Sequence, residues 1–275
     1  GGSLHSRLWW SGSGHRLTPV SMALYRTYRP ASLDEVVGQE HLTGPEGAIG
    51  RMVAAGRLSS MILWGPPGTG KTTVARLLGK IYKEMGLLKK GHVVEVDRSD
   101  LVAEYIGQTA PKTKEAIKKA KDGILFIDEA YALARKDEDN KDFGKEAIEI
   151  LLKELSDATD IAIIVAGYPE EMDAFLESNP GLKSRFVIQY EFPDYTPQEL
   201  VKIAEFAASK RSVNFNEESR KLFTKYLTDK YRDRDKFFGN ARLVNSMVDE
   251  AKMNLGLRIM KSDHPENLDV AALST

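Results

Sequence analysis

Four short apolar runs in the middle of the chain predict the strands of a single sheet. The runs lie at 61–64, 93–96, 123–127 and 161–166, and apolar residues at helical spacing fall between them. The run 123–127, Gly-Ile-Leu-Phe-Ile, carries no polar side chain, as expected of a parallel strand that is covered on both faces. Strands that alternate with helices favour a three-layer α/β fold, with a parallel sheet between two layers of helices.

The pattern changes near residue 195. Thr196-Pro197-Gln198-Glu199 has the form of a capping box with proline at the first helical position, and helical patterns continue to about residue 259. We therefore predict an α/β domain at residues 25–194, a small all-helical lid domain at 195–261 and a frayed tail at 262–275.

Composition narrows the class of protein only slightly. The chain has 275 residues, of which 42% are hydrophobic and 29% charged, as in ordinary globular proteins. A net charge of −1 argues against a nucleic-acid partner without ruling out a local basic patch. Cysteine is absent, and no apolar run approaches the roughly 18 residues of a membrane helix, so we expect a cytoplasmic protein. Residues 1–21, which are rich in Gly, Ser and His, are interpreted as a disordered expression leader.

A phosphate-binding loop follows the first predicted strand. Residues 65–72, Gly-Pro-Pro-Gly-Thr-Gly-Lys-Thr, fit the motif G-x-x-x-x-G-K-S/T. In this motif the backbone wraps a polyphosphate, Lys71 places a cation near the β and γ phosphates, and the Thr72 hydroxyl is a ligand of Mg²⁺. A helix predicted from Thr72 to about Ile81 would point its free N–H groups at the same phosphates. The predicted cofactors are ATP and Mg²⁺, with nucleotide contacts from Pro66, Pro67, Gly68, Thr69, Gly70, Lys71, Thr72 and Thr73.

Two carboxylates end the third predicted strand. Asp128 and Glu129 directly follow the run 123–127, so they emerge at the carboxyl end of the sheet, where open α/β folds bind their ligands. There Asp128 can join the Mg²⁺ shell, while Glu129 orients and deprotonates the water that attacks the γ phosphate. A solvated pair of carboxylates is the alternative interpretation.

With these two motifs, the chain resembles the AAA+ ATPases. From about residue 79 to 261 it is similar to the CbbX/SpoVK branch, which includes the red-type rubisco activase and the secretion ATPase EccA. The resemblance is carried by the segments 105–114, 128–131, 166–168, 179–186 and 239–242. Residues 22–78 are similar instead to the clamp loaders and the RarA group, notably in Tyr28-Arg29-Pro30 and in 36–41. A chimera joined near the phosphate loop is therefore one interpretation of the chain.

The resemblance implies further site residues. Arg185 corresponds to the arginine finger, which reaches the γ phosphate of a neighbouring subunit. Arg242 corresponds to the second sensor, and with Asn240 as helix cap it would lie in a first helical turn, where a cation is unfavourable unless an anion offsets it. Tyr168 stands where the family usually has a small polar first sensor. Val37 and Gly38 match the segment that contacts adenine.

Tyr105-Ile106-Gly107 resembles the loop with which these ATPases grip a protein substrate in a central pore, and a buried tyrosine is the alternative. The resemblance implies a ring, expected to be a hexamer, whose subunits pack head to tail. We therefore expect an ATPase that remodels a protein substrate, with a role related to rubisco activation, sporulation or secretion. A DNA-associated ATPase of the clamp-loader or RarA type and an engineered fusion with a passive binding module remain alternatives.

Overall fold

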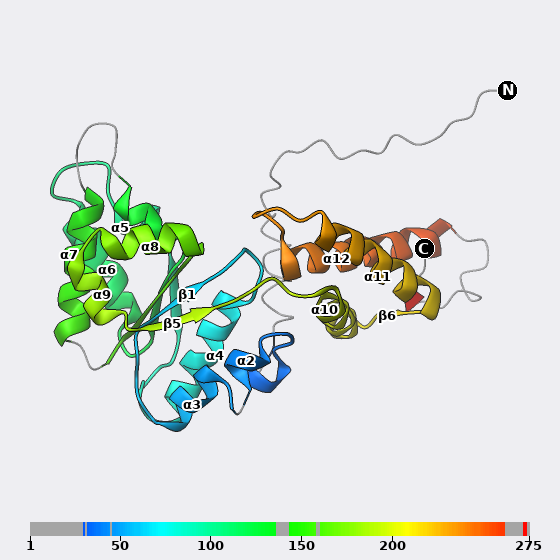
Figure 1. Ribbon diagram of the computed structural model, residues 1–275, viewed down its shortest axis with the longest axis horizontal. Helices are drawn as coiled ribbons and strands as arrows, with labels where there is room; N and C mark the ends of the chain where they lie inside the picture. The colour runs from blue at the N-terminus through cyan, green and yellow to red at the C-terminus, as the bar shows by residue number, and fades with distance from the viewer. Residues whose placement is uncertain are drawn as a thin grey trace.

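The computed structural model contains a five-stranded parallel sheet in the order β2-β3-β4-β1-β5 (Figure 1). The structure describes residues 30, 32–44, 46–135, 143–157, 160–261 and 272–273. The predicted leader and the segment Tyr28-Arg29 lie outside these residues. The five strands are β1 (Met61–Trp64), β2 (Val93–Val96), β3 (Ile124–Ile127), β4 (Ala162–Gly167) and β5 (Ile188–Glu191).

The first four strands confirm the predictions to within one residue, whereas β5 was not predicted. Strand β5 lies at one edge of the sheet and pairs in parallel with β1. Ile188 and Tyr190 are half-buried, and Gln189 and Glu191 are exposed. A four-residue strand of this kind lacks the continuous apolar run by which central strands are recognised.

Each face of the sheet carries its own hydrophobic core, because successive side chains of a strand point to opposite faces. In β1, Ile62 belongs to one core, whereas Met61 and Leu63 belong to the other. The first core includes residues from α5 (Arg98–Leu101), α6 (Thr109–Ala120), η2 (Ala130–Ala134), α7 (Phe143–Asp157), α8 (Pro169–Glu177) and α9 (Pro180–Arg185). The second includes residues from α2 (Glu40–Thr43), α3 (Ala48–Ala54) and α4 (Lys71–Glu84), and η1 (Leu33–Glu35) packs beside it. These layers confirm the predicted three-layer fold.

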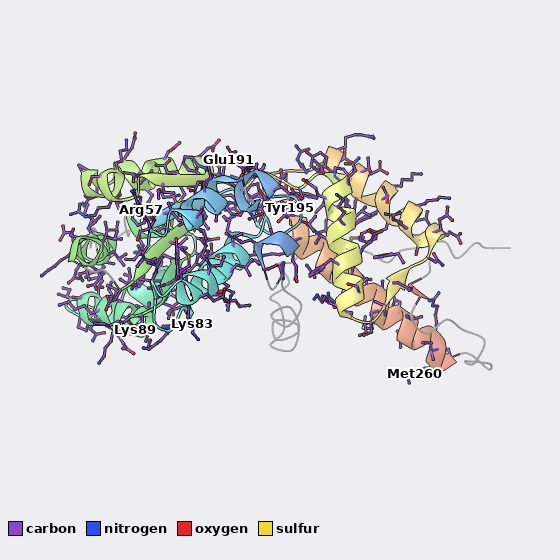
Figure 2. The ribbon with its side chains drawn as sticks, turned by 90° about the horizontal axis from the view of Figure 1, so that it is seen from below. Arg57, Lys83, Lys89, Glu191, Tyr195 and Met260 are labelled. Atoms are coloured by element: carbon purple, nitrogen blue, oxygen red, sulfur yellow. The ribbon has the colours of Figure 1, made fainter. Side chains whose placement is uncertain are left out.

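A separate helical lobe follows β5. It contains α10 (Pro197–Lys210), α11 (Glu217–Arg232) and α12 (Asn240–Lys261), which share a third hydrophobic core. Both hydrogen bonds of the predicted capping box at Thr196 are present, and Pro197 is the first residue of α10. Figure 2 shows Tyr195 between the two lobes and Met260 at the far end of the helical one.

The lid is not entirely helical, which corrects the prediction. Residues Asn214–Phe215 (β6) pair in parallel with Ala272–Leu273 (β7), so two residues of the tail that was predicted to fray are paired with the lid. Inside the lobe, the buried Arg211 guanidinium donates from Nε to Oδ1 of Asp249 at 2.6 Å. This ion pair joins the end of α10 to α12.

Candidate active site

The phosphate-binding loop connects β1 to α4 and depends on three glycines with positive φ. Gly65, Gly68 and Gly70 have φ of 142°, 76° and 97°, which L side chains rarely adopt. At Gly68 there is no room for a side chain either, because a Cβ would lie 2.1 Å from the carbonyl oxygen of Gly239 in the lid. The helix that follows begins at Lys71 and reaches Glu84, beyond the predicted end near Ile81.

Lys71 is held inside this loop. Its Nζ donates to the carbonyl oxygens of Gly65 at 2.7 Å and Pro66 at 2.6 Å. Burial lowers the pKa of Lys71 to about 8, a shift that Asp128 opposes and Arg242 reinforces. A buried cation whose nearest acceptors are neutral carbonyls favours an anionic ligand, so the loop fits a phosphate group.

Three neighbouring strands deliver the rest of the site to one edge of the sheet. Strand β4 lies between β1 and β3, so the phosphate loop, Tyr168 and the pair Asp128-Glu129 all follow the carboxyl ends of adjacent strands. Glu129 has φ of 50°, a left-handed conformation that costs free energy in a residue other than glycine. The backbone N–H of Glu129 donates to Oδ1 of Asp128 at 3.1 Å, which orients the Asp128 carboxylate.

Tyr168 stands beside Glu129 at the end of β4. Its ring packs against Tyr131 with centroids 6.2 Å apart. Burial raises the pKa of Tyr168, and the nearby Glu129 carboxylate raises it further. The phenol therefore keeps its proton at neutral pH and can donate a hydrogen bond.

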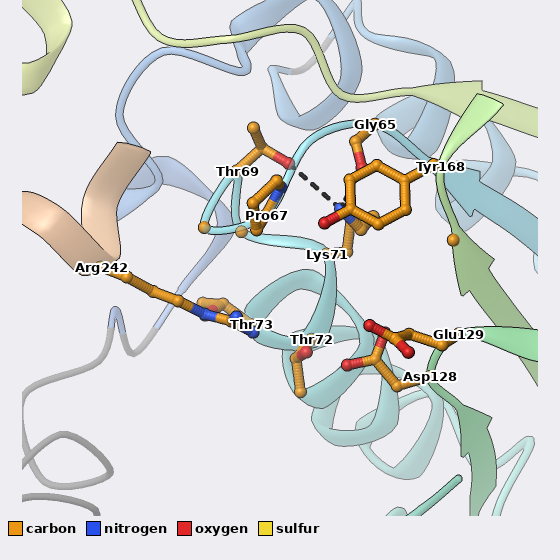
Figure 3. A pocket seen from close by; sticks show the side chains of 13 residues that line it. Gly65, Pro67, Thr69, Lys71, Thr72, Thr73, Asp128, Glu129, Tyr168 and Arg242 are labelled. Carbon is orange, nitrogen blue, oxygen red and sulfur yellow. Dashed lines mark hydrogen bonds between the residues drawn. The ribbon is translucent and has the colours of Figure 1, made fainter. Parts of the chain in front are cut away.

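One pocket brings these groups together with the lid. Figure 3 shows Arg242 entering from α12 and the two carboxylates from β3, with Thr72 and Thr73 between them. The Thr72 hydroxyl and the Asp128 carboxylate both line the pocket, and such oxygen ligands suit Mg²⁺. The lining residues are Gly65, Pro67, Gly68, Thr69, Gly70, Lys71, Thr72, Thr73, Asp128, Glu129, Gly167, Tyr168 and Arg242. Pro66 does not line the pocket, and its carbonyl accepts from Lys71.

A second pocket adjoins the phosphate loop on the side of the N-terminal segment. Val37 lines it, whereas Gly38 is buried behind it, where a Cβ would lie 2.6 Å from Cδ1 of Tyr195. The pocket also includes lid residues such as Ile203 and Phe206, which the sequence did not identify as nucleotide contacts. Its lining is Pro30, Glu35, Val36, Val37, Gly68, Gly70, Thr73, Tyr195, Ile203, Phe206, Ala207, Ala241 and Asn245. An apolar residue of the lid has the same sequence pattern whether it contacts a base or packs inside the lid, so these contacts could not be predicted.

Two groups of predicted site residues lie away from the nucleotide pocket. Arg185 is exposed at the end of α9 and donates from Nη2 to Oγ of Ser156 at 2.6 Å. Tyr105 and Ile106 are 68% and 77% exposed, and Gly107 has φ of 80° with open space around it. The alternative of a buried Tyr105 is therefore wrong. Tyr105 lines a broad groove that also contains Glu129.

The prediction that Asn240 caps α12 is wrong. It is the first residue of that helix, with φ of 46°, and its side-chain oxygen accepts from the N–H of Tyr195 at 2.9 Å. The carbonyl of Gly239 instead accepts from the N–H of Arg242 at 2.9 Å. Arg242 lies in the first turn of α12 and lines the same pocket as the phosphate loop, where a bound phosphate would offset its charge.

Comparison with known proteins defines the class. The sequence matches the ATPase family associated with various cellular activities (AAA) over residues 61–194, and the AAA lid domain over residues 196–275. The chain belongs to the AAA ATPases, and the predicted ATP hydrolase class is confirmed. The RuvB Holliday junction branch migration motor of Thermotoga maritima has the same fold, with a TM-score of 0.60 and 23% identity over 89% of this chain and 71% of that one.

Curated relatives narrow the class to the predicted CbbX/SpoVK branch. Stage V sporulation protein K of Bacillus subtilis (strain 168) is 45% identical over 217 residues, 78% of this chain and 67% of the relative. Protein CbxX (chromosomal) of Cupriavidus necator is 47% identical over 73% of this chain and 62% of its own length. The ribulose bisphosphate carboxylase/oxygenase activase of Cyanidioschyzon merolae is 46% identical over 72% and 67%. The chain thus spans 62–67% of the length of these relatives.

None of the helices in the described part of the chain has the length and the apolar character needed to cross a membrane.

Proposed function

We propose that this ATPase binds Mg-ATP in the pocket between its two lobes and couples hydrolysis to the remodelling of a protein substrate. Lys71 would neutralise phosphate charge, and Thr72 and Asp128 would hold Mg²⁺, whose positive charge would offset that of the phosphates. Glu129 accepts the proton of the attacking water, and Tyr168 orients that water through its phenolic hydrogen. Arg242 contacts the γ phosphate from the lid, and Val37 borders the base, with Gly38 buried behind it.

The exposed position of Arg185 supports a role between subunits. Arg185 does not line its own nucleotide pocket, and its hydrogen bonds are to neutral groups such as Ser156 and the Gly181 carbonyl. We therefore assign it to the γ phosphate of an adjacent subunit in a head-to-tail ring, expected to be a hexamer. The effect of such a finger in other phosphoryl-transfer systems is roughly 10³–10⁵ in rate.

The observation that carries the remodelling function is the groove that contains both Glu129 and Tyr105. The exposed aromatic loop and the carboxylate assigned to hydrolysis thus line the same groove. A change at Glu129 during the ATP cycle can therefore alter the surface of the groove that Tyr105 also lines. The exposed ring and the neighbouring Ile106 offer apolar contact to a polypeptide, and Gly107 gives the loop conformational freedom.

Replacing Tyr105 with alanine tests this assignment. Because the ring is exposed, Tyr105→Ala should leave the melting temperature and the basal ATPase rate unchanged. It should abolish stimulation of the ATPase by a protein substrate, measured as phosphate release with rubisco and with reduced, carboxymethylated α-lactalbumin. Tyr226→Ala is the matched control, because Tyr226 is an exposed lid tyrosine outside the groove.

Two results would contradict the proposal. A large drop in melting temperature for Tyr105→Ala would show that the ring stabilises the fold. Stimulation by duplex DNA instead of protein, with a strong dependence on salt, would favour the DNA-associated alternative.

A further inference from the structure

Asn240 is a fully buried polar residue at the point where the lid meets the phosphate loop. Its relative exposure is 0% and its φ is 46°, so the chain holds a residue other than glycine in a left-handed conformation there. Its Nδ2 lies within hydrogen-bond distance of the Pro67 carbonyl at 3.1 Å, Oδ1 of Asp194 at 2.7 Å and the Phe238 carbonyl at 3.1 Å. One side chain thus touches the loop, the connection between the lobes, and the lid.

The lid holds three successive carbonyls of the phosphate loop. Nδ2 of Asn240 donates to Pro67, the N–H of Ala241 donates to Gly68 at 3.2 Å, and the hydroxyl of Tyr195 donates to Thr69 at 2.9 Å. The first turn of α12 is therefore fixed to the loop that surrounds the phosphates.

Arg242 lies two residues after Asn240 and lines the nucleotide pocket, whereas Asn240 does not line it. A further hydrogen bond supports the contact between Asn240 and Asp194, because Oδ2 of Asp194 also accepts from Nε of Arg234 at 3.1 Å. Asn240 and Arg234 thus hold Asp194, in the connection between the lobes, from two sides. A small rotation of α12 would break these bonds and move Arg242 away from the phosphates.

We propose that Asn240 is a positioning residue for Arg242, and that its amide keeps the lid at the angle from which Arg242 reaches the γ phosphate. This inference rests on the role assigned to Arg242 in the proposed function. It does not depend on the protein substrate, since the contact is made within one subunit.

Asn240→Gly is the informative variant, because glycine accepts the positive φ and removes only the amide. We expect kcat for basal ATP hydrolysis to fall about tenfold, the effect of losing about 1.4 kcal/mol of transition-state contact. The Kd for ADP should change by less than about twofold, because ADP has no γ phosphate for Arg242 to contact. In an Arg242→Ala background, Asn240→Gly should cause no further loss of kcat.

Asn216→Gly is the matched control, since Asn216 caps α11 in the same lid through its side-chain bond to the N–H of Ser219 at 2.8 Å. It should lower the melting temperature and leave kcat unchanged. If Asn240→Gly does not fold, Asn240→Asp carries the test: it keeps the acceptor for Tyr195 and places a carboxylate against Asp194, so the same loss of kcat is expected.

The results separate this inference from the proposed function. An equal loss of kcat in the wild-type and Arg242→Ala backgrounds, or a parallel loss of ADP affinity, would show that Asn240 acts on the loop itself and would overturn the inference. An unchanged kcat would also overturn it. A wild-type protein without ATP turnover would instead refute the proposed function, and one that hydrolyses ATP without stimulation by protein would refute only the remodelling step.

Discussion

The buried Lys71 makes nucleotide affinity depend on pH in a range where most lysines do not titrate. In the free protein, burial lowers the pKa of Lys71 to about 8. Bound phosphates place negative charge beside Nζ and favour its charged form, so the pKa is higher in the complex. Binding therefore takes up a proton above pH 8. Affinity is full below the free pKa, falls as the pH rises through it, and levels off above the pKa of the complex.

The size of the effect follows from this value. With a free pKa near 8, about nine-tenths of Lys71 is protonated at pH 7 and about one-tenth at pH 9, so Kd should rise about tenfold between them, or about 1.4 kcal/mol. Phosphate groups do not interfere, because their second ionisation lies near pH 6. Tyr168 lines the same pocket as Lys71, and burial raises its pKa, so this phenol stays mostly neutral over the range.

Titration with a fluorescent nucleotide from pH 7 to 9.5 measures this change directly, and calorimetry in buffers of different ionisation enthalpy measures the proton uptake. Lys71→Arg is the control, because a guanidinium does not titrate in this range; its affinity is expected to be weaker and independent of pH. A wild-type Kd that stays constant to pH 9.5, with no proton taken up, would refute the assignment of Lys71 to the phosphates.

The other variants separate binding, cleavage and assembly. Lys71→Ala should lose nucleotide binding, whereas Glu129→Gln should bind ATP and lose cleavage, because only activation of water is removed; normal phosphate release by Glu129→Gln would exclude that residue as the base. Arg185→Ala should bind ATP normally and hydrolyse it roughly 10³-fold or more slowly. Mixing it with Lys71→Ala should restore part of the activity by pairing an intact site with an intact finger, and a fully active monomer in light scattering would contradict this.

The sequence predicted the parts of the site that follow strand ends. The loop at 65–72 and the pair Asp128-Glu129 were found because a motif adjoined an apolar run, and a parallel sheet sends the ends of neighbouring strands to one edge. Strand β5 was missed because its two polar side chains face solvent at the sheet edge. Tyr105 was assigned to an exposed loop only from the family resemblance, since an isolated Tyr-Ile pair is equally compatible with a core, and the structure confirms its exposure.

The contact between lid and loop was beyond sequence reasoning for a different physical reason. Its acceptors are the main-chain carbonyls of residues 67–69. Every residue type has such a carbonyl, so the side chains at these positions do not indicate that the lid binds there. The donors lie 126 to 173 positions further along the chain. The positive φ of Asn240 places its amide against the loop and away from the N–H groups of its own helix. Asparagine before a helix usually indicates a cap. Here the tertiary contact uses the same amide, and the helix start is satisfied by the carbonyl of Gly239 instead. A polar residue that gives up its local role while fully buried is therefore a sign that it holds two parts of the molecule together.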